Sequence, residues 1–255
     1  MSLRKRFALF FFSMGVLGAL YVGSLVDLPP IGHGIGAYAE MLLEIAVPET
    51  HATDVVAAVT FGYRAIDTFI EELILFAAVV GVSVIMRRHS DERDATEREL
   101  EHPLMIHPAS SESDAVRALT AALAGISLTV GLYTAAHGQV SPGGGFQGGI
   151  VLASVPLLVY LAASPERYLR IAPIPLLEYA KALGLLAFLG IGFAGALFGQ
   201  AFFDNVFPLG PRPSSVVSSG MILLLSLATT VEVSAGFVYL LTSFVEEALR
   251  QRLTK

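Results

Sequence analysis

Glu232 is the residue of this 255-residue chain whose surroundings most favour chemistry, because it lies near the centre of a long apolar run, in LATTVEVSAGF. An ionised side chain at that depth in a membrane is costly unless it is paired or hydrated. Such a carboxyl group is suited to exchange a proton, or to bind a sodium ion with Thr229, Thr230 and Ser234 nearby. The alternative is a neutral acid that hydrogen-bonds a neighbouring helix.

A second charged group stands at the start of another apolar run. Asp67 and Glu71 are four residues apart, and Arg64 is three residues before Asp67, so the three share one helical face. They are candidates to bind or relay an ion; for Arg64 and Asp67 the alternative is a salt bridge that anchors the outer end of a span. Glu72 points about 100° away, so we expect it to reach water or a different subunit.

The most unusual stretch is HGQVSPGGGFQGGIVLA, which begins at His137. Its octapeptide consists of Pro142, Gly143, Gly144, Gly145, Phe146, Gln147, Gly148 and Gly149. The glycine spacing formally matches a dinucleotide fingerprint, but no strand precedes it and an apolar run follows, so we do not expect nucleotide binding. Two interpretations remain: tight helix packing that glycine permits, or a hydrated cavity lined by Gln147 and His137.

The composition indicates an integral membrane protein. Hydrophobic residues make up 54% of the chain and charged residues 15%, whereas an ordinary globular domain has about 25% charged residues. Apolar runs of about 20 residues are long enough to cross a bilayer. Six are present, at Phe7–Leu25, Asp67–Met86, Val116–His137, Phe146–Ala163, Lys181–Phe203 and Gly220–Phe244. They are apolar all round rather than alternating, so we predict an all-α protein with six transmembrane helices.

The basic residues predict that both termini are cytoplasmic. Thirteen of the 16 Lys and Arg residues fall in segments that six spans place on one side, while Arg64 and Arg212 dissent and Lys181 is at a boundary. Lys181 and Glu178 are three residues apart at the expected inner start of the fifth span, so the simplest expectation is a snorkelling lysine paired locally. The first apolar run is longer than the about 7–15 residues of a signal peptide, so we expect an uncleaved anchor.

A charge-rich segment after the second run divides the chain. We therefore predict a two-span segment at 1–90, a cytoplasmic linker at 91–115 and a four-span domain at 116–255. The stretch GIGAYAEMLLEIAV spaces Ala37, Met41 and Ile45 at helical intervals. We expect it to form a short interfacial helix outside the membrane.

Several function classes find no support in the sequence. The chain has no cysteine, which excludes thiolate ligation of zinc or an iron–sulfur cluster. No Ser-His-Asp or HExxH pattern is visible, and the net charge of −6 comes without a basic patch for nucleic acid. We therefore expect no enzymatic activity, no cofactor, no metal and no nucleic-acid partner.

Two segments resemble a known family. PGGGFQGG, between the first and second spans of a four-span unit, is similar to the signature of the MnhB/MrpB subunit of multisubunit Na⁺/H⁺ antiporters, which also has membrane-bound hydrogenase relatives; this resemblance covers about residues 100–255. The front part, about residues 1–95, resembles an MbhE-like segment with an Arg-x-x-Asp-Thr-x-x-Glu pattern. Here Arg64, Asp67, Thr68 and Glu71 occupy that pattern.

The resemblance implies a membrane subunit of a cation/proton antiporter that does not work alone. Its partners would be other subunits of the complex, Na⁺, H⁺ and the lipid bilayer of the cell (inner, cytoplasmic) membrane. The candidates for ion translocation are Glu232, Glu71, Asp67, Arg64, Lys181 and His137, with Lys181 as a polar relay toward Glu232. Two alternatives stay open: a structural subunit that seals the complex, and a membrane-arm subunit of a hydrogenase-like, redox-driven pump.

Overall fold

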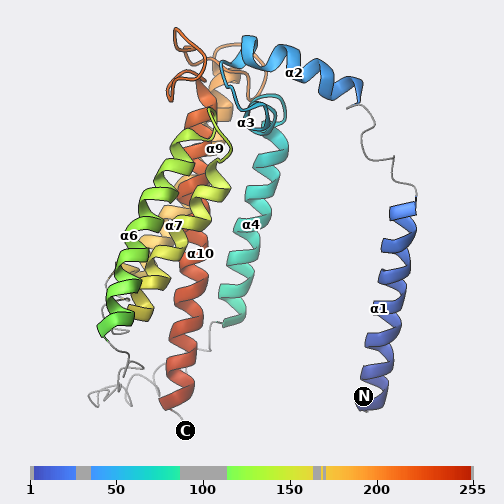
Figure 1. Ribbon diagram of the computed structural model, residues 1–255, viewed down its shortest axis with the longest axis vertical. Helices are drawn as coiled ribbons and strands as arrows, with labels where there is room; N and C mark the ends of the chain where they lie inside the picture. Colours follow the sequence, from blue (N-terminus) through green and yellow to red (C-terminus); the bar gives the residue numbers. More distant parts are fainter. Residues whose placement is uncertain (1–2, 27–35, 87–113, 163–167, 169–170, 254–255) are drawn as a thin grey trace. The chain divides into compact units, whose positions relative to one another are not determined.

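The protein is described by a computed structural model that covers residues 3–26, 36–86, 114–162, 168 and 171–253. Its elements are α1 (Leu3–Val26), α2 (Ala37–Thr50), α3 (Val55–Ala58), the π-helix η1 (Val59–Tyr63), α4 (Ala65–Met86), α6 (Asp114–His137), α7 (Gly145–Ala162), α9 (Ile174–Leu197) and α10 (Met221–Leu253) (Figure 1). Within these ranges β pairing is limited to one isolated bridge between Leu209 and Ser219. The predicted all-α fold is confirmed.

Five of the six predicted spans correspond in approximate position to helices that could cross a membrane, and the count of six stays a prediction. Five are long and apolar enough to cross a membrane, namely Phe7–Val26, Ala65–Met86, Asp114–His137, Ile174–Leu197 and Met221–Val245. The remaining predicted span corresponds to a shorter apolar helix, Gly145–Leu161. The helix expected before the second span is also present, as α2.

The chain forms two compact units, Met1–Met41 and Leu42–Lys255. The first contains α1 and the beginning of α2, and the second contains the rest of α2 and the helices from α3 onward. Helix α4, which we assigned to a separate two-span segment, packs against α10 inside the second unit. Most of the predicted linker lies outside the described residues, so the division into 1–90, 91–115 and 116–255 stays a prediction.

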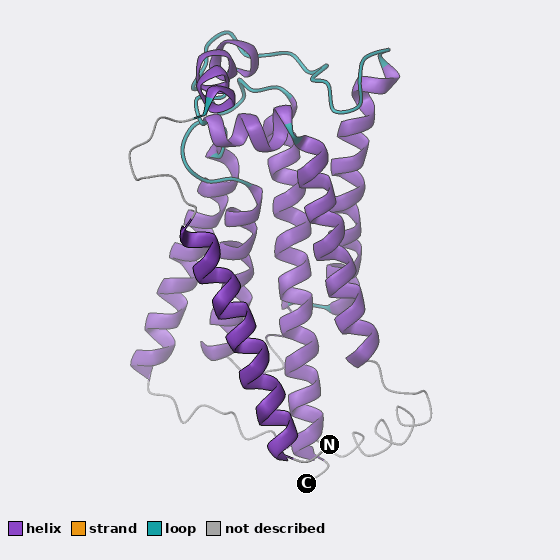
Figure 2. Ribbon diagram, turned by 90° about the vertical axis from the view of Figure 1, so that its right-hand side faces the viewer, coloured by secondary structure: helices purple, strands orange, loops and turns teal. Residues whose placement is uncertain are grey.

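Helix α10 is the centre of the second unit. It packs against α4, α7 and α9. In its most apolar stretch of 18 residues 67% of the residues are buried, against 28% in the corresponding stretch of α9 and 11% in that of α4. Its helical neighbours run along it, with α4 and α7 in the same direction and α9 in the opposite one (Figures 1 and 2). Ala, Ser and Thr are frequent along α10, which suits a membrane interface where small side chains let backbones approach.

The glycine-rich octapeptide places the start of α7 against α10. A Cβ at Gly145 would lie 2.5 Å from Cβ of Thr229, and one at Gly149 would lie 2.8 Å from Cβ of Val233. Any side chain at these positions would collide with α10. The two glycines are four residues apart and so face the same helix.

Other glycines of the octapeptide contact α6. A Cβ at Gly148 would lie 2.7 Å from Cβ of Ala135, and one at Gly143 would lie 2.8 Å from the carbonyl oxygen of Thr134. Gly144 has φ of +132°, a conformation that L side chains rarely adopt. Of the two interpretations of the octapeptide, the structure supports helix packing.

Helix α9 begins earlier than the sequence suggested. The predicted run, Lys181–Phe203, is wrong at both ends, because the helix covers Ile174–Leu197. Pro173 is its N-cap, and Pro175 stands in the first turn, where a missing N–H costs nothing. Gly199, with φ of +76°, follows the last turn. Lys181 is therefore two turns inside the helix instead of at its boundary.

Loops at the end of the bundle where α4 and α7 begin are joined by side chains. The Gln139 amide donates from Nε2 to the carbonyl of Ala136 at 3.0 Å and to the carbonyl of Val216. His51 Nδ1 lies 2.8 Å from the carbonyl oxygen of Gly210. These bonds connect the α6–α7 turn and the end of α2 to the loop before α10.

A matched pair of glycine substitutions tests the packing of α7 on α10. We expect Gly149→Ala to lower the stability of the protein by about 1–3 kcal/mol, because the added methyl group overpacks the contact with Val233. At Gly190 in α9, a Cβ would have no neighbour within 4 Å, so Gly190→Ala should stabilise slightly through its higher helix propensity. Thermal unfolding in lipid nanodiscs measures both; equal effects would contradict the packing.

Candidate functional site

Two buried glutamates meet between α4 and α10. Glu72 is 0% exposed and Glu232 is 1% exposed, and their carboxyl groups adjoin. Thr229, one turn before Glu232 on α10, donates a hydrogen bond from Oγ1 to Oε1 of Glu72. Within the described part of the chain, Oε2 of Glu72 and both carboxyl oxygens of Glu232 have no hydrogen-bond partner.

The charge state of this pair follows from its surroundings. Two carboxylates side by side repel each other, and the repulsion is strong where little water screens it. Burial also disfavours each charge separately. Keeping both carboxyl groups ionised in the bundle interior is therefore costly unless a cation joins them. Three buried oxygens without a partner are an incomplete arrangement that a proton or a cation would complete.

Lys181 approaches the same junction from α9. It is 6% exposed, and its Nζ lies 4.1 Å from the ring centroid of Tyr239 and 5.6 Å from that of Phe76. Phe76 is one turn after Glu72 on α4, and Tyr239 is two turns after Glu232 on α10. The ammonium group therefore lies among α4, α9 and α10, displaced from the carboxyl pair toward the far end of α4. The expectation that Lys181 snorkels from a helix boundary is wrong, because the side chain is enclosed, while its expected local pairing with Glu178 stays a prediction.

Close backbone contacts surround the pair. A Cβ at Gly184 of α9 would lie 2.6 Å from the backbone nitrogen of Glu232 and 2.8 Å from its Cβ. On another side of α10, Gly145 of α7 touches Thr229, the residue that donates to Glu72. Four helices thus converge at one level of the bundle, and the absence of side chains at two glycines brings them together.

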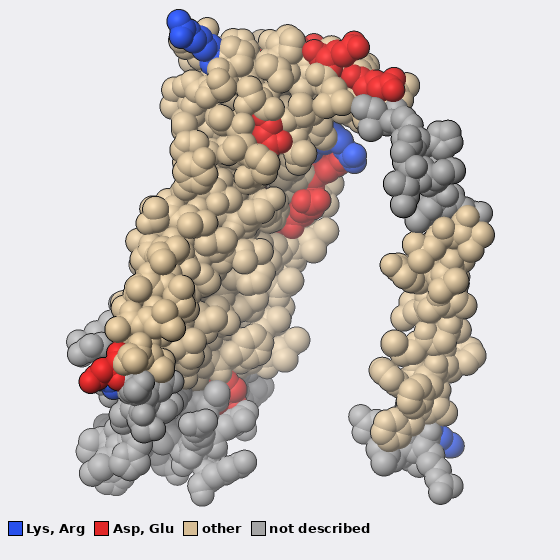
Figure 3. Space-filling view, in the orientation of Figure 1, with Lys and Arg blue, Asp and Glu red and all other residues tan. Residues whose placement is uncertain are grey.

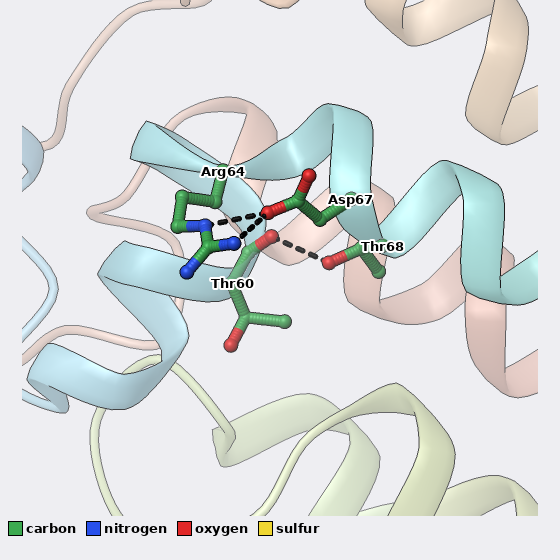
Figure 4. A network of polar contacts seen from close by, with 4 residues as sticks. All are labelled: Thr60, Arg64, Asp67 and Thr68. Atoms are coloured by element: carbon green, nitrogen blue, oxygen red, sulfur yellow. Dashed lines mark hydrogen bonds and ion pairs between the residues drawn. The ribbon is translucent and has the colours of Figure 1, made fainter.

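The charged residues predicted at the start of α4 lie on its surface. Nε and Nη2 of Arg64 each lie 2.5 Å from Oδ2 of Asp67, and the two side chains are 61% and 45% exposed (Figure 4). Beside them the Thr68 hydroxyl donates to the carbonyl of Thr60 at 2.7 Å. Glu71 is exposed. The structure does not bring these three charged residues to the buried pair.

His137 and Gln147 lie apart from the pair as well. His137 ends α6 half-buried and stacks on Tyr133, with ring centroids 4.2 Å apart; its Nδ1 is buried without a partner among the described residues. Gln147 is exposed. The described part of the chain contains no group of three or more His, Asp or Glu side chains arranged to hold a metal ion.

Glu72 is the site residue that the sequence analysis placed wrongly. We expected it to reach water or another subunit, whereas it is fully enclosed. The sequence did contain a signal, namely the helical spacing of Thr68, Glu72, Val79 and Ser83, all of which are buried in the structure. These fall on one helical face, and their small polar members mark it as the face that packs inside a membrane bundle.

Comparison with other sequences identifies relatives of this chain. Residues 115–239 match the family described as a domain related to the MnhB subunit of Na⁺/H⁺ antiporters. One subunit of the Na⁺/H⁺ antiporter of Alkalihalophilus pseudofirmus is 34% identical over 91 residues, which are 35% of this chain and 61% of that protein. An uncharacterized protein of Methanocaldococcus jannaschii is 29% identical over 214 residues, covering 78% of this chain and 81% of the relative.

Solved structures share the fold along nearly the whole chain. A chain of the membrane-bound sulfane sulfur reductase, an archaeal respiratory membrane complex, matches with a TM-score of 0.69 at 22% identity, covering 94% of this chain and 97% of that one. A chain of the Mrp complex from Dietzia sp. DQ12-45-1b matches with a TM-score of 0.69 at 21% identity, covering 95% of this chain and 26% of that one. Identities this low establish the fold alone.

Removing the Thr229 hydroxyl tests the contact between α10 and α4. We expect Thr229→Val to destabilise the protein by about 1–3 kcal/mol, because it leaves another buried oxygen of Glu72 without a donor. Thr129→Val is the matched control, since the Thr129 hydroxyl bonds only within its own exposed helix face. Thermal unfolding in nanodiscs compares the two. A Thr229→Val protein as stable as the control would show that the hydrogen bond does not join the helices.

Proposed function

Because residues 115–239 belong to the family of domains related to the MnhB subunit of Na⁺/H⁺ antiporters, we propose that this chain is a membrane subunit of a multisubunit cation/proton antiporter-like complex. Its sequence similarity to a subunit of the Alkalihalophilus antiporter and its fold likeness to a chain of an Mrp complex support the proposal. The partners are then other subunits of the complex, together with Na⁺ and H⁺.

The proposed topology has six spans and both termini in the cytoplasm. Five helices have sufficient length and hydropathy. The sixth, Gly145–Leu161, is at the short end of the about 17–25 residues that suffice for a transmembrane helix. The distribution of Lys and Arg along the sequence supports the orientation. A protein of this kind would reside in the cell (inner) membrane.

The buried Glu72 and Glu232 pair is the observation that carries the proposed mechanism. Since two negative charges side by side in the interior are costly, a proton or a cation bound between the carboxyl groups is favoured. Competition between Na⁺ and H⁺ for the same oxygens would couple their movements. Lys181, beside Tyr239, supplies a positive charge on the side toward the far end of α4. It stabilises the ionised form of the pair, or relays charge from it.

The other residues predicted for ion translocation lie away from the buried pair. Arg64, Asp67 and Glu71 lie on the exposed side of α4, and His137 lies at the end of α6. A path that includes them would pass between this chain and its neighbours. Their part in ion translocation stays a prediction.

A purely structural subunit is the second candidate function. Its support is the enclosure of both carboxyl groups and the hydrogen bond from Thr229 to Glu72, which holds α10 to α4. In this case ions cross in neighbouring subunits. The remaining alternative, a membrane-arm subunit of a redox-driven complex, is supported by the fold likeness to a chain of an archaeal respiratory complex. Co-purification of iron–sulfur subunits would favour it.

Neutralising the pair in the intact complex tests the mechanism. We expect Glu232→Gln and Glu72→Gln each to slow the Na⁺-dependent collapse of a preformed ΔpH in everted vesicles by about tenfold or more, because each removes the exchangeable charge from the bundle interior. Glu44→Gln, an exposed position in α2, is the matched control and should transport normally.

Assembly of the complex must be measured in the same membranes. Transport lost while all subunits still co-purify supports exchange at the pair. Transport at the control rate in both variants would reject exchange at the pair and favour the structural subunit.

A further inference from the structure

Two consecutive glutamates of α4 lie at one depth and face opposite environments. Glu72 is enclosed by the bundle, whereas Glu71 is exposed. In the part of the chain that the structure describes, Glu71 forms no ion pair or side-chain hydrogen bond with another residue. Because Arg64 and Asp67 pair with each other, the carboxylate of Glu71 is the unbalanced charge at this end of α4.

Glu71 lies at a depth where an exposed carboxylate would face the apolar interior of a lipid bilayer, which is energetically costly. Arg87 and Arg88 follow Met86 in the sequence and fix one membrane boundary. About 20 helical residues cross the hydrocarbon core, so the opposite boundary falls near Asp67. At 1.5 Å per residue, Glu71 lies about 6 Å inside that boundary. An ionised carboxylate facing lipid tails there is strongly disfavoured.

The side of α4 that carries Glu71 also has small exposed residues, against which another helix could pack. Ile74, one turn beyond Glu71, is 64% exposed. Ala77, Ala78 and Gly81 are also exposed, and a Cβ at Gly81 would have no neighbour within 4 Å. Small residues four apart, such as Ala77 and Gly81, let a second transmembrane helix approach closely. Figure 3 shows acidic and basic side chains together at the level where α4 begins and uncharged surface beyond them.

We propose that this α4 face, made of Glu71, Ile74, Ala78 and Gly81, docks a transmembrane helix of a neighbouring subunit that carries a Lys or Arg at the depth of Glu71. Charge complementarity selects this occupant over lipid, which offers no hydrogen-bond donor in its tails. It also selects against α1, whose basic residues all stand in its first turn. The remaining turns of α1 carry no Lys or Arg.

Site-directed crosslinking identifies the occupant. The chain has no cysteine, so Ile74→Cys supplies a unique attachment point for a maleimide-linked benzophenone in membranes that hold the whole complex. We expect a covalent adduct to a neighbouring subunit, within a transmembrane segment that contains Lys or Arg. Leu183→Cys on α9, at 65% exposure against 64% for Ile74, measures the yield on a face without a carboxylate. Adducts of Ile74→Cys to lipid alone, or to α1, would overturn the proposal.

Charge reversal tests the chemistry of the contact. We expect Glu71→Lys to reduce co-purification of the crosslinked subunit by about tenfold or more, and reversal of that subunit's basic residue to Glu to restore it. Glu44→Lys makes the same charge change at an exposed position of α2 and should leave co-purification intact. Co-purification unaffected by Glu71→Lys would contradict the docking. The result is independent of transport at Glu72 and Glu232.

Discussion

Burial of two carboxyl groups against each other is the constraint around which this bundle is arranged. Neither Glu72 nor Glu232 reaches solvent. The pair accepts a hydrogen bond from the Thr229 hydroxyl, and Lys181 lies among the same helices, next to Tyr239. An apolar bundle would gain nothing from such a pair. The exchange of a proton or cation that we propose would give the pair a role.

Close packing positions the pair. Membrane helices associate through contact between backbones, since lipid offers no hydrophobic driving force. Gly145 and Gly149 bring α7 onto α10, and Gly184 brings α9 onto α10 at Glu232. The glycine-rich octapeptide thus has a packing role. It holds α7 against α10, and α10 carries Thr229 and Glu232, which face α4.

The contrast between Glu71 and Glu72 connects the interior to the surface. The two residues differ by about 100° around α4, which is enough to separate an enclosed site from an outward face. In a membrane both environments are apolar, so each carboxylate needs its own partner. For Glu72 the partner lies within the chain. For Glu71 it must come from outside the described residues.

The sequence by itself determined the apolar helices, their approximate limits and the position of Glu232 inside one of them, because length, hydropathy and an isolated charge are local properties. It placed α9 late, since the run IPLLEY reads as weakly apolar although Pro173 and Pro175 start a helix there. Only the tertiary structure decided that Glu72 rather than Glu71 meets Glu232, and that Lys181 is enclosed. Helical periodicity shows which residues share a face, but the face that turns inward is chosen by the packing of other helices.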